Sequence, residues 1–501
     1  MIHIKAEGLR GAANVLSHNG RNSLTAMFAN DETPLGKGYA VYCLFEDKGE
    51  KDIKIVRAQL EPGNELEFPS LTPLFPAAAW YEREIYDLFG IKPLEHPDLR
   101  PLVLHEGFPK EFYPMRKTIP CDSHVAGKRD YPLAKAQGEG LFEVPVGPIH
   151  AGIIEPGHFC FSQAGEAVLQ LDAKLFYTHR GIEKAVEGKS IGGALFMVER
   201  ICGACSVANA VSFCQAVEKL SYAKVPRRAE LTRVVIAEME RLYNHVGDTG
   251  NLCAGAGFTV PNAMGARLKE ELLRCNEKIA GNRFLRGMIV PGGIHRTLKD
   301  EDAKIILAQL TRTENDYRLL TQVLNGQDGF LNRIQKTGIV RKKTAIDLAM
   351  VGIGARASGV GRDARKDLAY GIYSELAFDI CTETAGDVEA RLLVRIKEVA
   401  ETIKIIRQAL SLLAHEPETS ICSEKLECRS YEGAWGISES ARGSDLHWVM
   451  LDEQQNIYRL FVRSASYPNW PALPIAMQGE IIPDFPLVNK SFELCYACLD
   501  R

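Results

Sequence analysis

The chain has 501 residues, enough to bury a substantial core and to form more than one domain. Its 60 Lys and Arg residues nearly balance 64 Asp and Glu residues, which leaves a net charge of -4 and argues against nucleic acid as a partner. No uninterrupted apolar stretch reaches about eighteen residues, and the first residues, MIHIKAEGLRGAANVL, lack a secretory apolar core. We therefore expect a cytoplasmic protein, soluble or peripheral to other subunits.

The first part of the chain, residues 1–115, is predicted to form a small α/β domain. Strand-like runs at Tyr39–Phe45 and Ile53–Leu60 accompany a helical segment at Ala77–Phe89 that is bounded by proline. Residues 116–140 are polar and charged without a clear period, which predicts a linker.

The second part, residues 141–501, is predicted to be mainly helical, so the fold class is α+β. Apolar residues recur at three- and four-residue steps in Ala229–Val246, Asp300–Leu324 and Asp387–Leu413. Two short strand-like runs, FEVPVGPIH and HFCFSQ, precede these helices. Near the end, Ile457–Ser464 is predicted to be a strand and the following SYPNWPALP a loop.

The chain has thirteen cysteines, and two closely spaced pairs of them carry the strongest chemical signal. Thirteen is an odd count spread over a large chain, which argues against a secreted disulfide framework. Cys202-Gly-Ala-Cys205 and Cys495-Tyr-Ala-Cys498 each have the two-residue gap that lets two sulfurs reach one metal. The pairs lie much further apart than the about 15 to 20 residues of a zinc ribbon. Spacing alone leaves zinc, another thiolate-bound metal, and redox or packing cysteines open.

The flanks of these pairs, ERICGAC and CYACLDR, resemble the two cysteine motifs of nickel-iron hydrogenase large subunits. Other pieces, among them GPIH, EPGHF, HRGIE, NHVGD and SARG, resemble the membrane-linked hydrogenases of the formate hydrogenlyase and hydrogenase-4 type and the quinone-site subunit of complex I. YEREIYDLFG and HPDLR resemble the small peripheral-arm subunit of complex I. The resemblance spans nearly the whole chain, as a fusion of two subunits.

This resemblance implies a nickel-iron centre whose iron carries carbonyl and cyanide ligands. Cys202 and Cys495 would be terminal ligands of nickel, while Cys205 and Cys498 would bridge nickel and iron. The related complex I subunit has lost these cysteines, so their presence favours hydrogenase over quinone chemistry. We therefore expect a hydrogenase that interconverts dihydrogen with protons and electrons.

Three further residues are candidates for roles around such a centre. By resemblance, Glu155 would carry protons away from Cys495, although a helix cap or a surface acid is the alternative. Arg442 would polarise or deprotonate bound hydrogen, with a structural ion pair as the alternative. Glu183 matches a position that in some relatives helps to bind Mg or another divalent ion, although a salt bridge is an equally good interpretation.

Other matched residues have plainer interpretations. His150 and His245 match positions of the complex I quinone pocket, but we expect them to hydrogen-bond the fold. The glycines at 352, 354, 359 and 361 are predicted to form turns rather than a phosphate loop. Asn209 and Glu493 stand where hydrogenases usually have His and Asp. Both side chains can still hydrogen-bond, so we expect the metal ligands to be kept while the level of activity changes.

No additional compact cysteine cluster is present in the sequence, so the resemblance implies that the electron relay lies in partners. We expect an iron-sulfur small subunit with its clusters, a ferredoxin-like electron-transfer subunit and membrane subunits that hold the chain at the inner face of the membrane, with maturation proteins acting on it. Two alternatives are a complex I-like oxidoreductase subunit without hydrogen chemistry and a zinc-stabilised scaffold.

Overall fold

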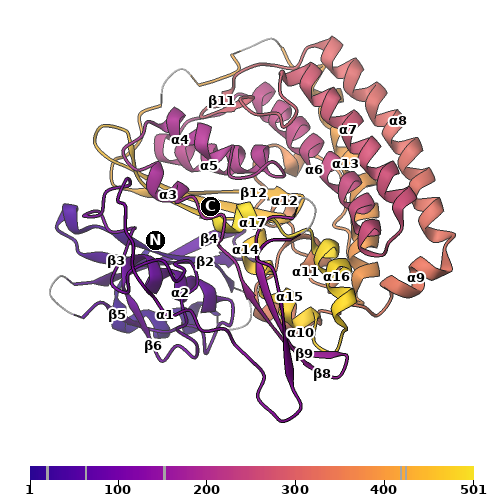
Figure 1. The fold of residues 1–501 in the computed structure, drawn as a ribbon. Coiled ribbons are helices and arrows are strands. Elements are labelled where there is room, and N and C mark those ends of the chain that lie inside the picture. Colours follow the sequence, from indigo (N-terminus) through magenta and orange to yellow (C-terminus); the bar gives the residue numbers. More distant parts are fainter. Residues whose placement is uncertain (18–21, 62–64, 151–153, 418–419, 424–425) are drawn as a thin grey trace.

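The computed structural model describes residues 1–501 except 18–21, 62–64, 151–153, 418–419 and 424–425. The N-terminal part forms one side of the molecule and the long helices form the other (Figure 1). The C-terminal helices α16 (Phe485–Phe492) and α17 (Tyr496–Asp500) lie between these two parts.

The N-terminal part is built on a four-stranded sheet in the order β1-β4-β3-β2, with bounds Ile2–Lys5, Asp52–Leu60, Tyr39–Asp47 and Asn22–Asp31. β1 pairs parallel with β4, and the other pairs are antiparallel. Helix α1 (Leu9–Ser17) packs near the sheet, and α2 (Ala78–Phe89) packs on β2. A second, two-stranded sheet pairs β5 (Glu67–Pro69) with β6 (Lys92–Leu94). The strands and the helix expected from the sequence are confirmed.

Residues 95–141 contain no helix or strand, and the predicted linker lies inside this segment. The segment is nevertheless held to the rest of the protein. Arg129 donates to the Asp87 carboxylate on α2 at 2.9 Å, and Arg100 donates to Asp172 at 2.9 Å on β9 (Ala167–Lys174). The segment that connects the two parts is therefore anchored to both of them. The domain boundaries themselves stay a prediction.

Four long helices build the larger part: α6 (Arg227–Gly255), α7 (Thr259–Ala280), α8 (Asp300–Asn325) and α13 (Val388–Leu413). α6 is central and contacts α7, α13 and α16. Its buried residues point to several sides, as expected for a helix surrounded by others. Asp387 caps α13, because its carboxylate accepts the Ala390 N–H at 2.8 Å. The predicted α+β fold class is confirmed.

Shorter elements complete this part. They are β7 (Phe142–Val146), β8 (His158–Ala164), α3 (Ile182–Ala185), α4 (Ile191–Val198), α5 (Ser206–Ser221), β10 (Ile289–Val290), β11 (Gly293–Ile294), α9 (Asp328–Ile334), α10 (Lys342–Asp347) and α12 (Ala364–Asp367). Strands β7, β8 and β9 form one antiparallel sheet.

A three-stranded antiparallel sheet links the two parts through a shared aromatic core. It consists of β12 (Gly433–Ser440), β13 (Gly443–Leu451) and β14 (Ile457–Arg463). Phe28 from the N-terminal sheet stacks on Phe461 with ring centroids 4.3 Å apart, and Tyr42 lies 5.0 Å from Trp448. These rings are buried, so the two parts share one core rather than a loose hinge.

Two predictions of local structure were wrong. The expected loop SYPNWPALP forms two short helices, α14 (Ser466–Asn469) and α15 (Ala472–Ala476). Its prolines fall at or before the first turn of each helix, where backbone N–H groups have no intrahelical partner. The glycines at 352 and 354 lie in helix α11 (Gly352–Ala357) rather than in a turn. Among the described residues, no helix is both long and apolar enough to cross a membrane.

Candidate metal centre

The two cysteine pairs meet in the interior. Cys202 and Cys205 lie in the loop between α4 and α5, and Cys495 and Cys498 lie at the start of α17. The Cys202 Sγ atom is 2.9 Å from that of Cys205 and 2.8 Å from that of Cys498. Cys205 and Cys498 are 2.9 Å apart, and the Cys495 sulfur lies within 4.8 Å of those of Cys202 and Cys498. All thirteen cysteines are free.

The chemistry of this donor set fits a metal ion. Cys202, Cys205 and Cys498 are buried, so thiolates there would have little access to water. Contacts with neighbouring sulfurs, first Cys202, raise the pKa of Cys495 to about 12, and similar contacts raise the pKa of Cys498 well above its usual value. Four cysteine sulfurs this close together can all be ionised only beside a cation, which would displace the thiol protons.

Both cysteine segments are held by one arginine that the sequence analysis did not single out as a site residue. Arg180 donates to the carbonyl of Ile201 at 2.7 Å and to that of Ala497 at 3.1 Å. It thereby ties the loop of the first pair to the helix of the second. The position of Arg180 in the sequence could not have shown these contacts, because they form only when the chain folds and brings the two cysteine segments together.

Glu155 lies beside the second pair. Its Oε2 atom accepts the backbone N–H of Ala497 at 2.9 Å, and Ala497 lies between the two cysteines of that pair. Partial burial, together with the negative charge of Cys495, raises the pKa of Glu155 above its usual value. The carboxyl group therefore lies beside the second cysteine pair, and its protonated form is favoured more than in an exposed glutamate.

Arg442 lies at the tip of the hairpin between β12 and β13, in a two-residue turn closed by the Ser440–Gly443 pair. Its guanidinium donates twice to Asp248, at 2.7 and 3.0 Å, and its Nε donates to the Glu493 carbonyl at 2.9 Å. A Cβ on Gly352 would lie 2.0 Å from the Arg442 carbonyl, so only glycine permits this close approach. Burial alone would lower the pKa of Arg442, but Asp248 and Glu493 hold it above its usual value. Arg442 is thus a fixed cation.

A cleft of about 800 Å³ opens beside the sulfurs and brings these groups together. Glu155, Arg442 and Glu493 line it, as do Gly203 and Ala204 from between the first two cysteines. These three ionisable side chains and the loop that carries two of the thiols therefore face one accessible space. This is the arrangement expected where protons and a small substrate reach a buried centre.

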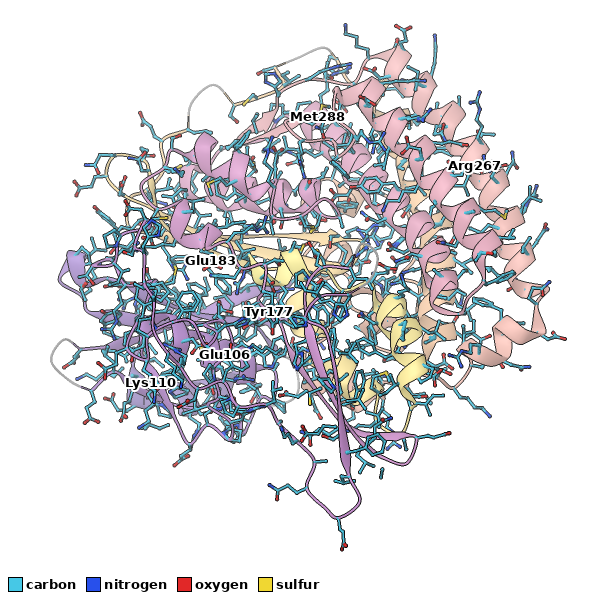
Figure 2. The ribbon with its side chains drawn as sticks, in the orientation of Figure 1. Glu106, Lys110, Tyr177, Glu183, Arg267 and Met288 are labelled. Atoms are coloured by element: carbon cyan, nitrogen blue, oxygen red, sulfur yellow. The ribbon has the colours of Figure 1, made fainter. Side chains whose placement is uncertain are left out.

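Glu183 lies near the middle of the molecule (Figure 2) and does not line the cleft. Its carboxylate accepts from Arg501 at 2.8 Å, from Arg459 at 2.7 Å and from the Val462 N–H at 3.0 Å. Arg501 also pairs with Glu84 of α2 at 2.6 Å, which joins the N-terminal part to the segment that carries Cys498. These contacts are those of a buried ion-pair network, and a divalent ion at Glu183 stays a prediction.

A Glu183→Gln variant is expected to lose about 3–5 kcal/mol of unfolding free energy, because two buried arginines lose a charged partner. Burial alone would raise the pKa of Glu183, but Arg501 and Arg459 hold it below its usual value. The contribution is therefore present above the unfolded-state pKa of about 4.3 and is lost as pH falls through the folded-state pKa. Urea denaturation at neutral and acidic pH measures both effects.

The control is Glu375→Gln, which removes an exposed partner of Arg227 and should cost less than about 1 kcal/mol. EDTA should leave the wild-type stability unchanged. A loss on chelation that Mg²⁺ restores would instead support the divalent ion.

His150 and His245 make the structural contacts that we expected. The Nε2 atom of His150 donates to the Gly157 carbonyl at 2.7 Å. His245 is buried on α6, with its Nε2 atom 2.8 Å from the Glu398 carboxylate. Of the two residues that depart from the hydrogenase motifs, Asn209 donates to the Cys205 sulfur at 3.6 Å, and Glu493 accepts from Asn251 at 2.6 Å.

Fold and site together define the class: a two-part subunit in which cysteines from two distant segments form a site suited to a metal centre. Residues 2–125 match the family described as the respiratory-chain NADH dehydrogenase 30 Kd subunit, and residues 256–501 match its 49 Kd subunit. Residues 180–254, which contain the first cysteine pair, match the nickel-dependent hydrogenase family.

Curated relatives agree with these matches. The chain is 32% identical to hydrogenase-4 component G and 33% identical to formate hydrogenlyase subunit 5, both of Escherichia coli, over all of this chain and 88% of each relative. It is 31% identical to NADH-quinone oxidoreductase subunit 4 of Thermus thermophilus over 74% of this chain and 96% of that one. The chain belongs to the family of nickel-dependent hydrogenase large subunits related to complex I, fused to a 30 Kd subunit-like part. The predicted resemblance is confirmed.

Proposed function

We propose that this chain is the catalytic large subunit of a multisubunit nickel-iron hydrogenase that interconverts dihydrogen with protons and electrons. The observation that supports it best is the meeting of four cysteine sulfurs beside a cleft that also contains Glu155 and Arg442. The complex I-like alternative without hydrogen chemistry does not require this sulfur cluster. The zinc scaffold does not require the two ionisable groups.

The proposed ligand set is nickel held by Cys202, Cys205, Cys495 and Cys498. Cys202 and Cys495 would hold nickel alone, and Cys205 and Cys498 would also hold an iron with carbonyl and cyanide ligands. When bound, this centre supplies a Lewis acid and a redox couple for splitting dihydrogen into a hydride and a proton.

The protein residues then handle the proton. The Cys495 thiolate is a base at the centre, since this cysteine is the least buried of the four. Glu155, which accepts the Ala497 N–H beside it, takes the proton onward into the cleft. Its raised pKa suits a group that alternates between the two protonation states.

Arg442 contributes a fixed positive charge at the cleft. Its raised pKa favours this polarising role over that of a base, because a guanidinium that pairs with Asp248 does not give up its proton. A cation held before substrate arrives stabilises negative charge as it develops.

Electrons must leave through partners. Within the described part of the chain, the only group of His, Cys, Asp or Glu side chains suited to hold a metal is the cysteine cluster. We propose that an iron-sulfur small subunit docks next to it, a ferredoxin-like subunit continues the relay, and membrane subunits hold the complex at the cytoplasmic face of the membrane. Maturation proteins would insert the metals.

Deuterium exchange tests the proposed reaction without an added electron donor or acceptor. The complex that contains this chain, isolated without oxygen, is expected to convert D2 in ordinary water into HD. Zinc at the site without HD formation would support the scaffold, and quinone or ferredoxin turnover without HD formation would support the complex I-like alternative.

A further inference from the structure

One face of helix α6 holds the backbone of the first cysteine pair. Tyr243 donates its hydroxyl to the Gly203 carbonyl at 3.0 Å, and Asn244 donates to the Ala204 carbonyl at 2.7 Å. One turn earlier, the carboxyl group of Glu240 accepts the N–H of Val207 at 2.7 Å and that of Ala208 at 3.0 Å. Tyr243 and Asn244 lie three and four residues after Glu240, so the three side chains share one side of the helix.

The two N–H groups that Glu240 accepts belong to the first turn of α5. Cys205 is the N-cap of that helix, and Val207 and Ala208 are its second and third residues. A capping side chain normally accepts one of these N–H groups itself. Cys205 makes no such bond, because Glu240 occupies both donors.

The second cysteine pair shows what happens where no such carboxyl group intervenes. Cys495 is the N-cap of α17, and its sulfur accepts the Cys498 N–H at 3.3 Å. In the first pair, the Cys202 sulfur accepts the Ala204 N–H at 3.3 Å. Among the residues that the structure describes, the Cys205 sulfur accepts from outside the cluster only the side chain of Asn209, at the longer distance of 3.6 Å. Within the described part of the chain, backbone N–H groups thus reach Cys202 and Cys495, which are proposed as terminal ligands, but not Cys205, which is proposed to bridge.

We propose that Glu240 is a positioning residue that withholds the helix N–H groups from the Cys205 sulfur and thereby keeps electron density on this bridging ligand. The inference rests on the proposed function, because it assumes that Cys205 bridges nickel and iron. Hydrogen bonds to a thiolate withdraw electron density from its metal and change the potential of the centre. Glu240 acts through the backbone and touches neither metal nor substrate.

Infrared spectroscopy of the intact complex measures this directly, because the stretching bands of iron-bound carbonyl and cyanide report the electron density at iron. In Glu240→Gln, the amide oxygen accepts one N–H but the amide nitrogen cannot accept the other. The released N–H is then available to Cys205, and the bands are expected to shift to higher wavenumber. Asn209→Ala removes the remaining donor and should shift them to lower wavenumber.

Two further variants complete the design. Glu240→Asp is one methylene shorter, reaches fewer of the N–H groups and is expected to give a shift of the same sign as the glutamine variant. Glu230→Gln is the matched control, since Glu230 is also on α6 but lines a separate cavity beside Gly371. Its bands should coincide with those of the wild type.

Nickel content and band intensity separate electronic from structural effects. A purely structural Glu240 would lower nickel content and intensity while the remaining bands keep their positions, which would overturn the inference. If the glutamine variant holds no metal, unshifted bands in Glu240→Asp would overturn it as well. A wild-type complex without any such bands would contradict the proposed function itself, and the inference with it.

Discussion

A Glu155→Gln variant is expected to keep its nickel and to lose about 100- to 10,000-fold of its dihydrogen-oxidation rate. Glutamine can still accept the Ala497 N–H that the Glu155 oxygen accepts at 2.9 Å, so the local structure is preserved. It cannot take up and release a proton, however. Dye reduction under dihydrogen, normalised to nickel content, measures the loss.

The matched control is Glu166→Gln, an exposed residue between β8 and β9 that should retain the wild-type rate. An unchanged rate in Glu155→Gln would show that protons leave by another path. A rate that falls only in proportion to nickel content would assign Glu155 a structural role at the second cysteine pair.

An Arg442→Lys variant is expected to lose about 100- to 1,000-fold of the rate per bound nickel. Lysine keeps the positive charge but cannot donate to both oxygens of Asp248 and to the Glu493 carbonyl at once. The positive charge would therefore move within the cleft. The result shows whether the rate depends on the exact position of this charge or only on its presence. The measurement is the same dye-reduction assay with metal analysis alongside.

Arg429→Lys serves as its control, because Arg429 pairs with Glu432 at the surface and should tolerate the exchange. If Arg442→Lys lost stability but kept the wild-type rate per nickel, the Asp248 pair would be structural only. That outcome would support the ion-pair interpretation that the sequence left open.

The long elements and the cysteine ligands could be predicted from the sequence because their signals are local. Helical periodicity located both ends of α8 and α13 to within one residue, and it located the start of α6, although α6 continues from the predicted end at Val246 to Gly255. The two-residue cysteine gaps and their flanks indicated a shared metal site, and the structure brings these sulfurs together. Hydrophobic pattern and motif spacing are properties of short segments, so neither depends on the tertiary fold.

The residues that hold the site could not be predicted, because their roles arise only when distant segments meet. Arg180 contacts both cysteine segments, and Glu240 caps a helix that begins more than thirty positions earlier. The prolines of 466–474 suggested a loop, since their tolerance in first turns depends on where each helix begins. Likewise, Glu84 contacts Arg501, which lies 417 positions further along the sequence.

The most direct test of the account is metal analysis of the anaerobically isolated complex, with a Cys495→Ala variant alongside. We predict nickel and iron at this site in the wild type and loss of nickel and of dihydrogen-dependent dye reduction in the variant. Zinc or no metal in an active wild-type complex, or a variant that retains nickel and activity, would contradict the proposal that the four thiolates hold the catalytic centre.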